Sequence, residues 1–151
     1  MRIAIFSDSH DHTENVTKAL GIVQAQGITN GIHLGDFTTQ PILDLLLAST
    51  LSWTLVRGNN DVNLPIPQDD FQEVTFEGRK LFVTHYPQIA RVAALSGKYD
   101  ACLHGHTHIA AQETIGTTLL ANPGELCGRR YGKASFGIYD TKGNKIEIIY
   151  L

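Results

Sequence analysis

The chain has 151 residues, of which 42% are hydrophobic and 18% are charged. These proportions are typical of a globular protein and exclude a disordered tail, a collagen-like fibre and a coiled coil, while the length suits a single domain over residues 1–151. The formal net charge is −3, and the 12 Lys and Arg residues are scattered along the sequence. Because there is no basic stripe, long DNA or RNA is not expected as a partner.

Neither a membrane anchor nor a secretion signal is predicted. The longest apolar run is Leu45 to Ala48 with its neighbours, far short of the ~20 residues that a spanning helix needs. The apolar stretch Ile3–Phe6 is followed at once by acidic residues and histidine, unlike a signal peptide. Cys102 and Cys127 are too few for a disulfide framework and are interpreted as small buried apolar residues. We therefore expect a cytoplasmic protein with no membrane partner.

The first half of the chain alternates predicted strands and helices. Apolar residues at Val16, Ala19, Leu20 and Val23 have the spacing of an amphipathic helix that begins at Thr13. The predicted elements are a strand over Arg2–Phe6, this first helix ending before Gly27, a strand over Gly31–Leu34, a helix over Pro41–Leu47 and a strand over Ser52–Val56. This alternation predicts βαβ units and a sheet with a parallel core.

The second half is richer in strands. Asn63–Asp70 contains two prolines and is predicted to be a loop. The elements expected after it are a hairpin of Glu73–Phe76 with Lys80–Thr84, a short helix over Ile89–Leu95, a buried strand over Ala101–Leu103, and hairpins around Gly116 and around Lys142-Gly143-Asn144. The fold class expected from these patterns is α/β with antiparallel additions, that is α+β in its second half.

Residues that can bind metal ions cluster at five points, each just after a predicted strand. The clusters are Asp8-Ser9-His10, Gly35-Asp36, Gly58-Asn59-Asn60-Asp61, Thr84-His85 and Gly105-His106-Thr107-His108. Strand ends converge at one edge of a layered α/β sheet, so these loops are expected to meet in one cleft. Carboxylate, imidazole and amide ligands together suit manganese, iron, zinc, cobalt or nickel rather than calcium. Seven candidate ligands exceed what one ion with an open position can take, which favours two ions.

These blocks resemble the calcineurin-like metallophosphoesterases, and above all the small bacterial and archaeal phosphodiesterases of that superfamily. The five blocks, in chain order, match Ser7–His10, His33–Asp36, Arg57–Asp61, Thr84-His85 and Gly105–His108, and an Asn-Pro-Gly segment, Asn122–Gly124, follows them as in those relatives. The resemblance runs along the whole chain, and five ordered blocks are far more specific than any single one. It implies the four-layer α/β/β/α sandwich of the metallo-dependent phosphatases, which pattern alone does not predict.

The resemblance also implies a dinuclear metal centre. One ion would be held by Asp8, His10 and His108, and the other by Asn59, His85 and His106, with Asp36 as the bridge. Asp36, Asn59 and His85 are the residues we expect to be catalytic. A carboxylate between two ions leaves open positions for a bridging hydroxide and for phosphate oxygens. Manganese is the expected metal, with nickel, zinc, iron, cobalt or magnesium as alternatives.

Two positions depart from the superfamily pattern. Many relatives have a histidine after the motif asparagine, thought to protonate the leaving group, whereas this chain has Asn60, whose amide cannot supply a proton at neutral pH. Close relatives often have Gly-His after the fourth block, whereas here Tyr86-Pro87 follows His85. Tyr86 is a candidate substrate contact. Asp61 either orients a ligand imidazole or holds the tight turn after Gly58.

Other polar residues near the blocks have simpler interpretations. His12 is expected to cap the first helix or face solvent, and Arg57 either to form a salt bridge at a strand end or to reach a phosphate. His33 and His104 are expected to be buried or to support ligands, but not to bind metal. Arg129 and Arg130 are expected to lie on a solvated loop.

The function predicted from these features is hydrolysis of small phosphate diesters by a dimetal phosphodiesterase. A phosphomonoesterase or a nucleotide pyrophosphohydrolase would use the same ligands and is the first alternative. A second alternative is a protein-binding scaffold, because the retromer subunit of this fold is an adaptor; loss of ligands would mark that state, and all seven positions here hold good ligand types. Homo-oligomer formation and the natural substrate are left open by the sequence.

Overall fold

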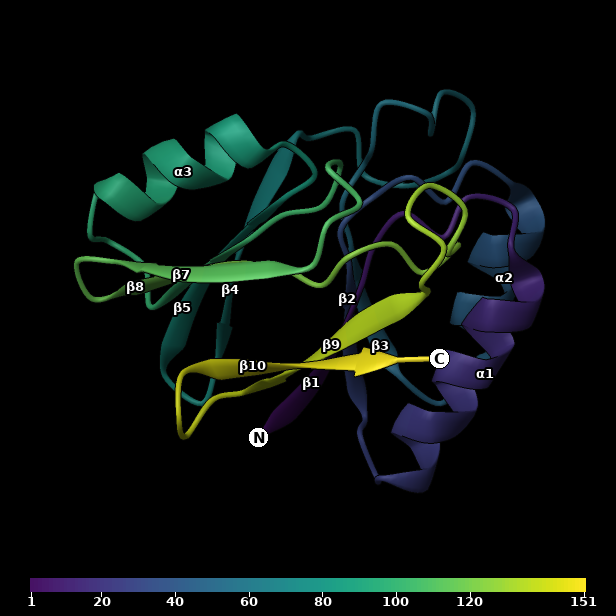
Figure 1. Ribbon diagram of the computed structural model, residues 1–151, viewed down its shortest axis with the longest axis horizontal. Helices are drawn as coiled ribbons and strands as arrows, with labels where there is room; N and C mark the ends of the chain where they lie inside the picture. Colours follow the sequence, from purple (N-terminus) through teal and green to yellow (C-terminus); the bar gives the residue numbers. More distant parts are fainter.

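Two five-stranded sheets form the centre of the computed structural model, which describes residues 1–151 (Figure 1). The helices are α1 (Thr13–Ala25), α2 (Gln40–Ala48) and α3 (Pro87–Leu95). The first sheet contains β1 (Arg2–Phe6), β2 (Asn30–His33), β3 (Ser52–Leu55), β9 (Ser135–Asp140) and β10 (Lys145–Tyr150). The second sheet contains β4 (Phe71–Phe76), β5 (Arg79–Thr84), β6 (Ala101–Leu103), β7 (Ala111–Ile115) and β8 (Thr118–Asn122).

Each sheet has a parallel core with antiparallel neighbours. In the first sheet β1, β2 and β3 are parallel, and the β9–β10 hairpin adds to the free side of β1. In the second sheet β5, β6 and β8 are parallel, and β4 and β7 pair antiparallel at the two edges. The predicted parallel core and hairpins are confirmed. The last hairpin, β9–β10, pairs with β1 of the first sheet. This pairing joins distant parts of the chain, and the local sequence pattern did not predict it.

Three apolar layers separate four layers of secondary structure. Alternation along β1 sends Ala4 and Phe6 toward α1 and α2, and sends Ile3 and Ile5 toward the second sheet. A smaller cluster around Cys102 fills the space between the second sheet and α3. The order is therefore helices, sheet, sheet, helix, as the α/β/β/α expectation required (Figure 1). None of the helices has the length and apolar character that crossing a membrane would need.

Element boundaries follow local chemistry closely. His12 caps α1 by accepting a hydrogen bond from the Asn15 backbone N–H at 3.3 Å, so the capping interpretation is confirmed. Helix α3 begins at Pro87, two residues before the predicted start, because proline is well suited to the first helical position. Strand β4 likewise begins earlier, at Phe71, whose backbone is paired with Thr84.

Truncation of Leu103 tests the packing between the sheets. Leu103 is fully buried there, so Leu103→Ala should lower the free energy of unfolding by about 2–5 kcal/mol. The matched control Leu47→Ala, at a position 62% exposed on α2, should change it by less than about 0.5 kcal/mol. Urea unfolding with a chelator present measures both. Equal losses in the two variants would contradict this layer assignment.

Candidate metal centre

The five predicted clusters lie at the carboxyl ends of parallel strands and meet at one edge of the sandwich. Backbone hydrogen bonds tie the loops together: the N–H of Asp8 donates to Gly35 O at 3.0 Å, and that of His10 to Asp36 O at 2.8 Å. The N–H of Gly105 donates to His85 O at 3.2 Å. Loops distant in the sequence therefore form one rigid platform for the side chains they carry.

Three candidate ligand atoms form a tight triangle on the open side of this platform. The Asn59 Oδ1 atom lies 3.2 Å from His85 Nε2 and 3.0 Å from His106 Nδ1, and the two imidazole nitrogens are 3.2 Å apart. A cation with ligand bonds of about 2.1 Å holds adjacent ligand atoms about 3 Å apart in octahedral geometry. The spacing of the triangle fits such a cation, and Asn59 and His106 are exposed to solvent.

The protonation of His85 follows from its other nitrogen. His85 Nδ1 lies 2.8 Å from the carbonyl oxygen of Leu34, which only accepts, so Nδ1 carries the proton. Burial lowers the pKa of His85, which keeps the ring neutral. Its Nε2 therefore carries a lone pair, which lies 3.2 Å from His106 Nδ1 and 3.6 Å from Asp36 Oδ2. Two acceptors face each other there, as expected around a bound cation.

A second pair of facing acceptors lies beside the first. His108 Nδ1 is 2.8 Å from the Glu125 carboxylate, so Nδ1 donates and the Nε2 lone pair is free. That Nε2 lies 3.3 Å from Asp8 Oδ1, a buried oxygen with no hydrogen-bond partner. Burial raises the pKa of Asp8 to about 7 despite a hydrogen bond from Ser7. An orphaned carboxylate oxygen opposite a free imidazole lone pair fits a divalent cation.

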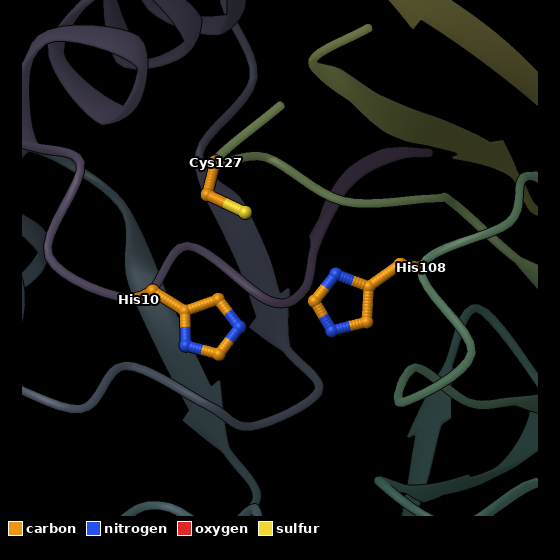
Figure 2. Close-up of side chains that lie close together, drawn as sticks. All are labelled: His10, His108 and Cys127. Carbon is orange, nitrogen blue, oxygen red and sulfur yellow. The ribbon is translucent and has the colours of Figure 1, made fainter. Parts of the chain in front are cut away.

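His10 and Cys127 border this second pair. The His10 and His108 rings are stacked with centroids 5.3 Å apart, and the Cys127 sulfur points toward the space between them (Figure 2). Cys127 is buried as expected, but its thiol donates to Glu125 Oε2 at 3.2 Å rather than making only apolar contacts. Burial raises the pKa of this thiol to about 12, so it is protonated and remains a hydrogen-bond donor.

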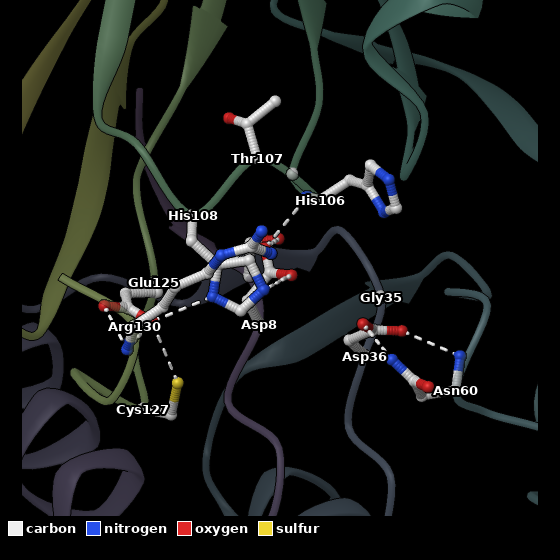
Figure 3. A network of polar contacts seen from close by, with 12 residues as sticks. Asp8, Gly35, Asp36, Asn60, His106, Thr107, His108, Glu125, Cys127 and Arg130 are labelled. Carbon is white, nitrogen blue, oxygen red and sulfur yellow. Dashed lines mark hydrogen bonds and ion pairs between the residues drawn. The ribbon is translucent and has the colours of Figure 1, made fainter.

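Asp36 lies between the two groups and is held by Asn60. The Asn60 backbone N–H donates to Asp36 Oδ1 at 2.9 Å, and its amide Nδ2 donates to Oδ2 at 2.7 Å (Figure 3). One candidate ligand oxygen of Asp36 also lies within 4.8 Å of the ligand atoms of both Asp8 and His85. Asp61 accepts from the backbone N–H groups of Asp36, Thr38 and Gly58, so it holds the turn and orients no imidazole.

Five of the seven candidate ligands have left-handed backbone conformations, which non-glycine residues rarely adopt. They are Asp8 (φ 51°), His10 (φ 47°), Asp36 (φ 60°), His106 (φ 68°) and His108 (φ 65°). Each such residue costs on the order of 1–3 kcal/mol, and these conformations concentrate at functional sites. The left-handed backbone at these five residues turns their side chains toward a common point.

Two glycines permit the close approach of the carboxylates. A Cβ on Gly58 would lie 2.2 Å from Asp36 Oδ1 and 2.3 Å from the Asp36 backbone nitrogen. A Cβ on Gly105 would lie 1.9 Å from Ser7 Oγ and 2.7 Å from Asp8 Oδ2. Neither position can carry a side chain unless a candidate ligand moves.

The remaining residues named in the sequence analysis either support the site or lie near the surface. His33 is buried; its Nδ1 accepts from the Gly35 N–H, so its Nε2–H donates to Ser9 Oγ at 2.9 Å. His104 is partly buried beside Gly105 and lies just after β6 rather than inside it. Arg57 forms the expected salt bridge, with Asp70 at 3.2 Å.

The two arginines after Gly128 differ from each other. Both are exposed, as expected, and Arg129 pairs with Asp11. Arg130 has no ion-pair partner, and both arginines line a shallow cavity of about 370 Å³ with His10 and His108. Tyr86 packs edge-on against His85 with ring centroids 5.4 Å apart, on the other side of the site.

Glu125 is the one site residue that sequence reasoning missed. Its signal was weak but present: a single acidic residue between the Asn122-Pro123-Gly124 turn and the apolar Leu126-Cys127 pair. Burial alone would raise its pKa, but backbone N–H groups of Tyr131 and Arg130 and the His108 ring together lower it. The carboxylate is therefore ionised and serves only as an acceptor.

Residues 1–144 match the calcineurin-like phosphoesterase superfamily domain. The chain belongs to this superfamily. Membership of this superfamily implies divalent metal ions, and the donor set described above fits such ions. The superfamily resemblance of the sequence blocks is thereby confirmed, together with the α/β sandwich.

Relatives of this superfamily member include two curated proteins and several solved structures. Phosphodiesterase MJ0936 of Methanocaldococcus jannaschii is 33% identical over all of this chain and 99% of its own. A solved archaeal phosphodiesterase superposes with a TM-score of 0.90 at 33% identity, with both chains fully covered. Vps29 of Chaetomium thermophilum shares the fold, with a TM-score of 0.79 at 16% identity, covering this whole chain and 94% of its own.

Adding one methyl group tests how tightly Asp36 is placed. In Gly58→Ala, the new Cβ displaces Asp36, so Mn²⁺ affinity should fall about tenfold or more in isothermal titration calorimetry. Gly21→Ala is the matched control, because its Cβ meets open space on α1; it should leave metal binding unchanged and stabilise the helix by about 0.5–1 kcal/mol. Unchanged affinity in Gly58→Ala would show that Asp36 is not a ligand.

Proposed function

We propose that this protein is a dimetal-dependent phosphodiesterase that hydrolyses small phosphate diesters. The observation that carries the proposal is the pair of facing acceptors, His108 Nε2 with Asp8 Oδ1 and His85 Nε2 with Asp36 Oδ2. Each imidazole has its proton committed to the opposite nitrogen, so each pair calls for a cation. The 33% identity to a phosphodiesterase over the full chain supports the same activity.

The proposed ligands divide into two sets bridged by one carboxylate. Asp8, His10 and His108 hold the first ion, and Asn59, His85 and His106 hold the second. Asp36 bridges them, which its position near both Asp8 and His85 supports. Bound divalent ions at such a centre lower the pKa of water and stabilise charge on the attacking and leaving oxygens.

The residues around the proposed ligands orient them and line the opening of the site. Asn60 fixes both oxygens of Asp36, so the bridging carboxylate cannot rotate. Tyr86 borders the second set and contacts the substrate, while His106 and Asn59 line the side open to solvent. Because the Asn60 amide is already bonded to Asp36 and has no acidic proton, the site offers no general acid at that position. We therefore favour diesters with good leaving groups over monoesters, with manganese as the metal.

Two other functions share parts of this site. A phosphomonoesterase or a nucleotide pyrophosphohydrolase would use the same ligands and differ only in substrate. A protein-binding scaffold of the same fold would have no need for free imidazole lone pairs that face carboxylates, or for the strained backbone that supports them. Retention of all seven candidate ligands favours the hydrolase over the scaffold.

A reducing compartment such as the cytoplasm is the proposed location. Cys102 and Cys127 are free, buried thiols, and burial raises the pKa of each to about 12. Both are consistent with a protein that folds without disulfides.

Removing the bridging carboxylate tests the proposed activity. Wild-type protein with Mn²⁺ should hydrolyse bis-p-nitrophenyl phosphate, and a chelator should abolish the reaction until Mn²⁺ is returned. Asp36→Asn should lower kcat by ~10²-fold or more, because bridging ligation is worth several kcal/mol. The control Asp44→Asn, exposed on α2, should keep full activity. Full turnover by Asp36→Asn would rule out the bridged centre.

Reciprocal alanine variants test the assignment of ligands to ions. His85→Ala should weaken the second site and leave the first, whereas His108→Ala should do the reverse, because each ring belongs to a different set. A Mn²⁺ titration followed by calorimetry distinguishes the two patterns. Two undiminished sites in either variant would contradict the assignment.

A further inference from the structure

The buried carboxylate of Glu125 has no Lys or Arg side chain as its partner. It follows β8, has none of its surface exposed, and is surrounded by donors from one loop and one imidazole. The donors are His108 Nδ1 at 2.8 Å, Cys127 Sγ at 3.2 Å, the Arg130 backbone N–H at 3.0 Å to both oxygens, and the Tyr131 backbone N–H at 2.7 Å (Figure 3).

The backbone around Glu125 prevents its side chain from turning away. Its carbonyl accepts from the Ser135 N–H at 2.9 Å, and the next residue, Leu126, donates to Ser7 O at 2.9 Å. The two backbone N–H groups of Arg130 and Tyr131 hold the carboxylate from the side opposite His108. The acceptor that His108 meets is therefore fixed in place by the fold.

A fixed acceptor determines which tautomer His108 adopts. Because the Glu125 carboxylate already accepts backbone N–H groups, it meets His108 Nδ1 as an acceptor; that nitrogen carries a proton, and in the neutral ring Nε2 is left with the lone pair. This lone pair faces Asp8 Oδ1, which lacks any hydrogen bond, at 3.3 Å. If the proton moved to Nε2, that nitrogen would carry an N–H in place of the lone pair that a cation needs.

We propose that Glu125 is a positioning residue that holds His108 in the Nδ1–H tautomer and so keeps its Nε2 lone pair available to a divalent cation. The inference rests on the proposed place of His108 in the first set of ligands. It adds a residue that touches neither the ion nor the substrate, and it assigns to that residue the choice between a lone pair and an N–H at the His108 nitrogen that faces the site.

The isosteric variant Glu125→Gln separates this role from simple packing. Its amide oxygen accepts from the Arg130 and Tyr131 N–H groups, which turns the NH₂ group toward His108 Nδ1. That nitrogen must then accept, so the proton of the neutral ring moves to Nε2, which no longer offers a lone pair to a cation. The matched control is Glu113→Gln, whose carboxylate is exposed and pairs only with Arg91.

Two measurements on the variants test the proposal. The ¹⁵N shifts of the neutral His108 ring in metal-free protein, identified by a pH titration, should report Nδ1–H in wild type and Glu113→Gln, and Nε2–H in Glu125→Gln. A Mn²⁺ titration of Glu125→Gln should show one site weakened ~10–100-fold and the other unchanged.

Other results would overturn the proposal. A His108 ring that keeps its Nδ1 proton in Glu125→Gln would do so, even if the variant melts at a lower temperature, because Glu125 would then serve stability alone. Unchanged affinity at both sites would also do so. Absence of esterase activity in wild-type protein would instead refute the proposed function, since the tautomer and the metal titration are measured without any substrate.

Discussion

Two imidazole nitrogens face carboxylate oxygens at one edge of the sandwich, and much of the local structure serves to keep them there. His108 Nε2 faces Asp8 Oδ1, and His85 Nε2 faces Asp36 Oδ2. Such contacts are unfavourable in a low-dielectric surrounding unless a cation joins them. A protein that holds them in place therefore gives up stability in the absence of metal and regains it when metal binds.

The fold supplies the rigidity that this constraint demands. Strands β1, β2, β3, β5 and β6 end at the same edge, and hydrogen bonds between their loops fix the backbone of Asp8, His10 and Gly105. Gly58 and Gly105 remove the side chains that would otherwise separate the loops. Behind the site, the close-packed apolar layer between the sheets excludes water and resists compression. Around it, Glu125 and Asn60 form hydrogen bonds with the candidate ligands His108 and Asp36.

Much of the fold and the outline of the site were predictable from local sequence. The continuous apolar run of β1 and the helical spacing around Val16 marked their elements, because a strand buried on both faces is apolar throughout and a helix buried on one face shows a period. The five polar clusters marked the site because each follows a strand. The side of the sheet that the β9–β10 hairpin joins was not predictable, since it depends on contacts more than a hundred residues apart. Glu125 was missed because one carboxylate in a loop has no pattern of its own. The contacts of Asn60 likewise required coordinates, because an amide after a ligand can face either the substrate or the carboxylate beside it.

Anomalous X-ray scattering from crystals of the protein grown with Mn²⁺ tests the central claim most directly. The account predicts two manganese peaks about 3.5–4 Å apart, one contacted by Asp8, His10 and His108, the other by Asn59, His85 and His106, with Asp36 between them. A single peak, or two peaks that lie away from these side chains, would contradict it.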